Sequence, residues 1–166
     1  MMLGLPLATF TLVHVVISLI GIAAGLVFFA GAIAGRWPRL PNLLFLVFTV
    51  LTSVTGFLFP PKPIGPPFIF GVVSLVLLAI ALYALYGRGA AGAWRRIYLA
   101  PALFAQWLNM VVLVVQSYQK IPALNALAPT GTEPAFLATQ GVVLVAVAYA
   151  GWALLWRDRR VVGQAV

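Results

Sequence analysis

The chain alternates between long apolar runs and short polar connections. Five of the runs reach the length of about 20 residues that a helix needs to cross the hydrocarbon core of a bilayer. They cover about residues 8–34, 42–59, 68–86, 96–118 and 134–156. Glycine, proline, tryptophan, tyrosine or arginine marks their ends, as is typical of helices that stop at a membrane interface. The pattern predicts an all-α, polytopic bundle of about five transmembrane helices, formed as a single domain over residues 1–166.

Composition excludes a water-soluble globular domain. Of the 166 residues, 64% are hydrophobic and 7% are charged, whereas soluble domains carry about 25% charged residues. A core this small cannot enclose so many apolar side chains, because a small domain leaves much of its surface exposed. Cysteine is absent, which excludes disulfides, thiolate metal sites and thiol nucleophiles. The first apolar run is too long for a cleaved signal peptide, so we expect it to be retained as a span.

The net charge of +8 arises from basic residues in the connections. With five spans, one side of the membrane receives Arg36, Arg39, Arg88, Arg95, Arg96, Arg157, Arg159 and Arg160. The other side receives Lys62, Lys120 and Glu133. The positive-inside rule therefore predicts an external N-terminus and a cytoplasmic C-terminus. It also favours the lipid bilayer over a nucleic acid as the partner of these arginines.

Polar side chains within the predicted spans are candidate sites, because they cost free energy in the bilayer unless they are satisfied. At a rise of 1.5 Å per residue, His14, Ser53 and Gln140 all lie about 9 Å below the outer boundary. We therefore expect an outward-facing polar pocket for a small hydrophobic or amphipathic molecule, with the long connection 119–133 as its cover. The candidate ligand-binding residues are His14, Ser53, Thr55, Trp107, Asn109, Gln116, Glu133 and Gln140.

The same residues also fit a second hypothesis, a non-catalytic accessory subunit of a larger membrane complex. Polar side chains on transmembrane helices commonly bond to neighbouring helices, at about 0.6 kcal/mol each. Gly21 and Gly25 share one face of the first span and are candidates for close packing, either within the chain or against another subunit or a second copy. His14 is equally compatible with packing and with ligand binding.

Few residues could support catalysis. No carboxylate or lysine lies within a span, which argues against a proton-coupled pump. The only acid–base pair is His14 with Glu133, supplemented by Lys120, so an enzyme is the less favoured class. A haem with two histidine ligands could form only across a dimer, because His14 is the single histidine. The sequence assigns no catalytic residue and no metal site, and any cofactor is unknown.

Several segments of the chain resemble two families. The stretch QSYQKIPALNALAPTGTEPAF (116–136) and the stretch 52–60 resemble an uncharacterised family of bacterial multi-pass proteins, which implies a location in the inner (cytoplasmic) membrane and no known activity. Lys62-Pro63, Pro66-Pro67 and the pair Gln106 and Asn109 are similar to motifs of the tryptophan-rich sensory and translocator family, whose five-helix members bind porphyrins or sterols. Here the Lys-Pro motif follows the second span instead of the first, so no binding residue is carried over.

Overall fold

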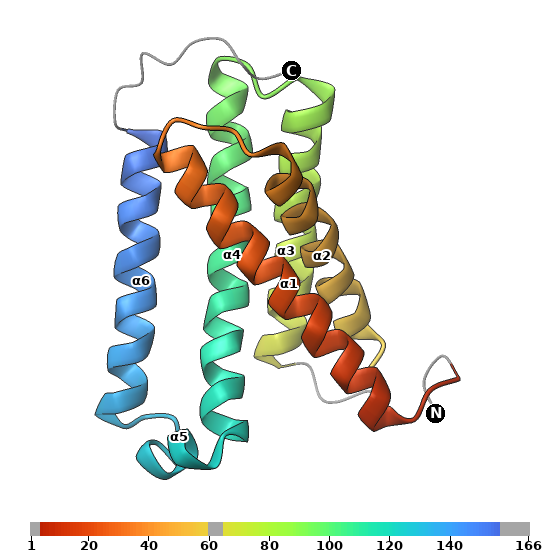
Figure 1. Cartoon of the computed structure of the whole chain (residues 1–166), viewed down its shortest axis with the longest axis vertical. Helices are drawn as coiled ribbons and strands as arrows, with labels where there is room; N and C mark the ends of the chain where they lie inside the picture. Colours follow the sequence, from red (N-terminus) through yellow and green to blue (C-terminus); the bar gives the residue numbers. More distant parts are fainter. Residues whose placement is uncertain (1–3, 60–64, 157–166) are drawn as a thin grey trace.

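The fold is a bundle of helices, seen in a computed structural model that describes residues 4–59 and 65–156 (Figure 1). Its elements are α1 (Leu7–Ile33), α2 (Arg39–Phe57), α3 (Pro66–Leu82), the π-helical turn η1 (Tyr83–Gly87), α4 (Ala93–Lys120), α5 (Pro122–Leu127) and α6 (Pro134–Leu155). Within this part of the chain, α1, α2, α3 with η1, α4 and α6 are each long and apolar enough to span a membrane. The predicted all-α architecture with five spans is confirmed, and the protein is an integral membrane protein.

α2, α3 and α4 begin two or three residues before the predicted apolar runs, whereas α1, α2 and α6 end one or two residues before the predicted limits. α2 begins at Arg39, ahead of Pro41, and α3 begins at Pro66. Proline is compatible with the first helical turn because the backbone N–H groups there have no partner within the helix. α4 continues through Pro101, and the connection beyond it contains the short helix α5, which the sequence pattern did not indicate. Lys62, the first part of the proline-rich connection 60–67, and Arg157, Arg159 and Arg160 lie outside the described residues.

α4 is the central helix of the bundle. It packs against α3 and α6 over much of its length and also contacts α1 and α2, while α1 and α2 form a closely packed hairpin. In Figure 1, α1 runs obliquely across the bundle, from beside α2 at one end towards α6 at the other. The spans on either side of each connection are antiparallel, so the connections gather at two opposite ends.

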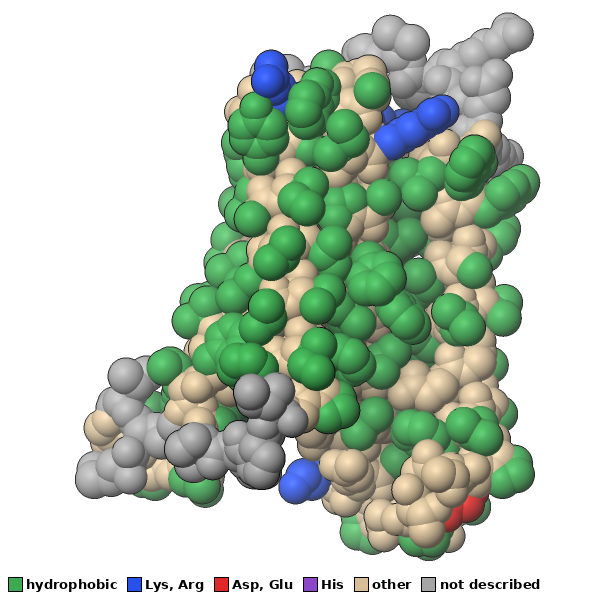
Figure 2. All heavy atoms as spheres, turned by 180° about the vertical axis from the view of Figure 1, so that it is seen from behind, with side chains coloured by type: hydrophobic (Ala, Val, Ile, Leu, Met, Phe, Trp, Pro, Cys, Tyr) green, Lys and Arg blue, Asp and Glu red, His purple; other side chains and the backbone are tan. Residues whose placement is uncertain are grey.

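The described charged residues are sorted between those two ends. Five arginines lie where α1 ends, α2 begins, η1 ends and α4 begins: Arg36, Arg39, Arg88, Arg95 and Arg96. Lys120 and Glu133 flank the connection between α4 and α6 at the opposite end. Figure 2 shows this separation, with an almost uncharged apolar belt between the two ends. The positive-inside rule predicts that the arginine end faces the cytoplasm, and we call the opposite end the outer end.

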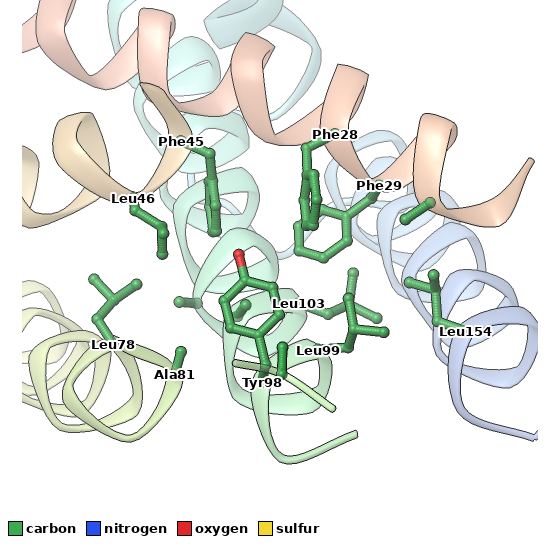
Figure 3. Close-up of a cluster of buried hydrophobic side chains, with 14 of the residues drawn as sticks. Phe28, Phe29, Phe45, Leu46, Leu78, Ala81, Tyr98, Leu99, Leu103 and Leu154 are labelled. Carbon is green, nitrogen blue, oxygen red and sulfur yellow. The ribbon is translucent and has the colours of Figure 1, made fainter. Parts of the chain in front are cut away.

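The apolar core, drawn in Figure 3, is formed by residues near the ends of the helices that carry the arginines. All five spans contribute to it, through Phe28, Phe29, Phe45, Leu46, Leu78, Ala81, Tyr98, Leu99, Leu103 and Leu154. The buried residues of α4 run from Tyr98 to Leu108, and beyond them only Tyr118 is buried. The segment 109–115 of α4 is half-buried at every position. The apolar core is therefore concentrated at the arginine end, and α4 is less buried in its outer half.

The glycine face of α1 packs within the chain. A Cβ atom on Gly21 would lie 3.3 Å from the backbone carbon of Phe48, and one on Gly25 would lie 2.3 Å from Gln106 Oε1. Both glycines are buried and allow α2 and α4 to approach α1. The expectation that this face could join a second copy or another subunit is corrected, because its surface is already occupied by helices of the same chain.

Candidate polar sites between the helices

His14 and Thr55 form the closest polar contact between α1 and α2. Nδ1 of His14 lies 2.7 Å from Oγ1 of Thr55, a residue 41 positions away in the sequence. The Thr55 hydroxyl also lies 2.6 Å from the backbone oxygen of Leu51, to which it donates its single proton. With the hydroxyl proton directed to Leu51, Oγ1 accepts a hydrogen bond from Nδ1–H of His14. In this tautomer Nε2 is left as a hydrogen-bond acceptor.

The second edge of the imidazole lies in apolar surroundings that leave it accessible. His14 is half-buried, and its ring meets Phe59 edge-on at a centroid distance of 5.1 Å. Phe10 packs against the other side of Phe59 at 5.0 Å. A Cβ on the exposed Gly56 would lie 3.8 Å from Cε1 of His14, so glycine at this position places no side chain over Cε1.

A second polar cluster lies deeper, where α1, α2 and α4 meet. Nε2 of Gln106 donates to the backbone oxygen of Ile22 at 3.0 Å, and Oε1 of the same buried amide has no hydrogen-bond partner. One turn further along α4, Nδ2 of Asn109 lies 3.5 Å from Oγ1 of the buried Thr49. Ser53 follows Thr49 by one turn and is also buried. These groups hold three helices together at the edge of the apolar core.

The other candidates on α4 and α6 lie apart from these two clusters. Nε2 of Gln140 donates to the backbone oxygen of Val111 at 3.3 Å and so joins α6 to α4. Trp107 is half-buried and packs edge-on against Phe104, which is itself exposed at the lipid-facing surface. Gln116 is exposed. The structure thus brings His14 together with Thr55, and Asn109 with Thr49, but it places Gln140, Trp107 and Gln116 in other surroundings.

Glu133 belongs to the outer connection and faces its own loop. Its carboxylate accepts the backbone N–H of Thr130 and of Thr132, each at 3.0 Å, and the Thr130 hydroxyl at 2.9 Å. The Thr130 N–H contributes most to lowering the pKa of Glu133, from 4.5 to about 2. Tyr118 ties the connection to the bundle, since its hydroxyl lies 2.9 Å from Oγ1 of Thr139. The described contacts make this segment a closed loop before α6.

The sequence pattern missed one buried polar pair. Tyr98, close to the start of the predicted span 96–118, is completely buried and donates a hydrogen bond to Oδ1 of the buried Asn42. The position of Asn42 in the first turn of an apolar helix was the one available signal. The pair links α2 and α4 at the arginine end, inside the core, where each group needs a partner.

The chemistry of these clusters is hydrogen bonding. Within residues 4–59 and 65–156, no three His, Asp or Glu side chains lie close enough together to hold a metal ion.

No family model, no curated protein and no solved structure matches this chain. The two family resemblances therefore remain predictions and supply no site residues. What the fold defines is the class, a polytopic α-helical membrane protein, and the half-exposed edge of His14 is its best candidate for a contact with a ligand.

Proposed function

We propose that the protein binds, or passes across the outer leaflet, a small hydrophobic or amphipathic molecule that contacts His14. The observation that carries the proposal is the fixed orientation of this side chain. Thr55 holds Nδ1, so Nε2 is left as an acceptor at a half-buried position that opens over Gly56. An acceptor in hydrocarbon surroundings gains from any donor that reaches it, because no water competes there.

The shape of the outer half is consistent with this role. The apolar core closes the bundle at the arginine end, whereas segment 109–115 of α4 is only half-buried. A molecule dissolved in the outer leaflet could therefore approach the helices laterally. Binding sites commonly combine an apolar lining with a few oriented polar groups, and Phe10 and Phe59 supply such a lining beside His14.

The ligand chemistry follows from the imidazole tautomer. Nε2 accepts a hydrogen bond, so the ligand should carry a hydroxyl or another donor at the polar end of an apolar body. The aromatic edges of Phe10 and Phe59 suit a ring or an unsaturated chain next to that donor.

The test is native mass spectrometry of the full chain, extracted gently from its own membrane, with identification of the molecules that co-purify. Loss of one hydrogen bond of about 1 kcal/mol predicts that His14→Ala lowers ligand occupancy about fivefold. His14→Gln, which keeps an acceptor near the place of Nε2, should retain part of the binding. Gly56→Leu should lower occupancy by covering the open edge.

The matched control is Ser18→Ala, because the Ser18 hydroxyl donates only to the backbone oxygen of His14 at 2.7 Å. This variant should bind as the unmodified protein does. Unchanged occupancy in both His14→Ala and Gly56→Leu would overturn the proposal. A loss confined to Gln140→Ala would place the ligand between α4 and α6 instead.

The alternative function is that of a non-catalytic accessory subunit. One observation favours it: the lipid-facing side of α6 carries an open, nearly flat apolar surface formed by Ala138, Gly141, Val142, Val145, Ala146 and Tyr149. Co-purification of a stoichiometric set of larger membrane subunits, with no small molecule bound, would support this function and contradict ligand binding at His14.

A further inference from the structure

A small pocket lies between α4 and α6 at the arginine end. Its volume is about 180 Å³, and it is lined by Arg96, Ala100, Leu155 and Trp156. Arg96 and Ala100 are one turn apart on α4, and Leu155 and Trp156 lie at the end of α6. One cationic group therefore stands at the cytoplasmic edge of a pocket whose other lining is mostly apolar.

Arg96 differs from two neighbouring arginines in its surroundings. The Arg88 guanidinium lies over the rings of Tyr83 and Trp94, at 5.6 and 5.0 Å, and its Nε donates to the Tyr83 hydroxyl. Arg95 lies 5.6 Å from the ring centroid of Trp37. Arg96 is exposed at the pocket and makes no such contact within the described residues. A guanidinium carries five N–H donors, and none of those of Arg96 has a hydrogen-bond partner among the described residues.

The described charged residues at this end are all positive. Five of the described arginines gather there, while Glu133, the one acidic residue in the described part of the chain, lies at the outer end. A guanidinium at the cytoplasmic interface attracts the anionic lipids of the inner leaflet, at about 1 kcal/mol per basic residue. The geometry of arginine also matches a phosphate group through two parallel hydrogen bonds.

We propose that this pocket binds one anionic phospholipid of the cytoplasmic leaflet. The headgroup phosphate pairs with Arg96, and the beginning of an acyl chain lies against Ala100 and Leu155. Trp156 is exposed at the rim, where an indole commonly sits at the level of the lipid headgroups. The bound lipid joins the ends of α4 and α6 across the pocket.

The size of the pocket supports a lipid held by part of its length. Pockets that enclose a whole small molecule measure roughly 300–1,000 Å³, and this one measures about 180 Å³. A free phosphate ion would leave the apolar lining of Ala100 and Leu155 unfilled. A phospholipid fits both the cationic and the apolar lining, since its phosphate contacts Arg96 and the start of an acyl chain contacts Ala100 and Leu155. The rest of the acyl chain remains in the bilayer.

The experiment is native mass spectrometry of the full chain, released from nanodiscs that contain equal amounts of phosphatidylglycerol and phosphatidylcholine. We expect one phosphatidylglycerol to be retained in preference to phosphatidylcholine. Arg96→Gln should lower this retention about tenfold, the change that corresponds to a charge-assisted hydrogen bond of about 1.4 kcal/mol. Ala100→Leu keeps the charge but fills the apolar part of the pocket, and it should also lower retention.

The matched control is Arg39→Gln, which removes one exposed positive charge from the same end of the bundle, away from the pocket. It should leave phosphatidylglycerol retention unchanged. Equal retention of the two lipids, or an equal loss in Arg39→Gln and Arg96→Gln, would overturn the proposal, since either would indicate general surface charge. Displacement of the lipid by millimolar inorganic phosphate would also overturn it and identify a simple anion site.

Discussion

At the scale of single residues, two glycines decide how closely α1 approaches its neighbours. Gly21 faces the backbone of α2, and Gly25 faces the side chains of Gln106 and Phe45. Gln106 cannot simply rotate away, because it is buried and its amide is bonded to the Ile22 backbone oxygen. The space left by Gly25 is therefore occupied by the Gln106 side chain, which is held there by its hydrogen bond to Ile22.

We predict that Gly25→Ala destabilises the protein. The new Cβ would lie 2.3 Å from Gln106 Oε1 and 2.8 Å from Phe45 Cδ2, so at least one buried side chain must move. Overpacking of this kind typically costs about 1–3 kcal/mol, which exceeds the gain of up to about 1 kcal/mol in helix propensity. Thermal unfolding in detergent should show a lower midpoint.

Gly141→Ala is the matched control for this substitution. Gly141 is also helical, but a Cβ there would meet no atom within 4 Å. The same chemical change should therefore leave the midpoint unchanged or raise it slightly through helix propensity. A similar loss of stability in both variants would contradict close packing at Gly25.

At the scale of elements, the connection between α4 and α6 owes its shape to hydrogen bonds. Asn125 of α5 donates to the backbone oxygen of Tyr118, and the Tyr118 hydroxyl reaches α6 at the backbone oxygen of Ala135. The carboxylate of Glu133, directly before α6, accepts hydrogen bonds from the backbone N–H groups of Thr130 and Thr132. The connection is thus anchored at both ends, which favours a fixed outer surface over a lid that swings open.

We predict that the loop closed by Glu133 is stable to low pH. The pKa of Glu133 is lowered from 4.5 to about 2. The contribution of its carboxylate to the stability of the loop is therefore fully present above pH 4.5 and is lost as the pH falls towards 2. A carbon-detected NMR titration of the carboxyl group in micelles should give a midpoint near 2. Thr130→Val removes the hydroxyl donor but keeps the backbone N–H, so the midpoint should rise while staying below 4.5. A midpoint of 4.5 in the unmodified protein would contradict the described loop.

At the scale of the whole molecule, both the charged residues and the buried core are distributed unevenly along the length of the bundle. The arginines and the tightly packed core both lie towards the same end, and the half-buried part of α4 and the accessible edge of His14 lie towards the other. The proposed lipid site and the proposed ligand contact therefore belong to opposite leaflets. Each can be altered without changing the other.

We predict that the arginine end faces the cytoplasm. The chain contains no cysteine, so single cysteines can be labelled without background. In right-side-out membrane vesicles, an impermeant maleimide should label Thr132→Cys at once and Ala91→Cys only after permeabilisation, because these two exposed positions lie at opposite ends. Labelling in the reverse order would invert the assigned topology.

The number and the approximate limits of the spans could be predicted because each transmembrane helix satisfies its backbone hydrogen bonds within itself. The residues at helix starts were harder to place, since Pro41 and Pro66 look like helix breakers in the sequence but occupy first turns in the structure. The contact between Asn42 and Tyr98 could not be predicted, because it depends on how two helices are rotated about their axes.

The sequence by itself determined the class of protein, its five spans and the sorting of its charges, because length, apolar composition and arginine position act locally along the chain. Only the tertiary structure decided which polar groups meet. α1 is apolar on all sides, so its sequence does not indicate that His14 faces Thr55 or that Gly25 faces Gln106. In a bilayer every face of such a helix is equally compatible with lipid, and the rotation of each helix is set by close packing and interhelical hydrogen bonds.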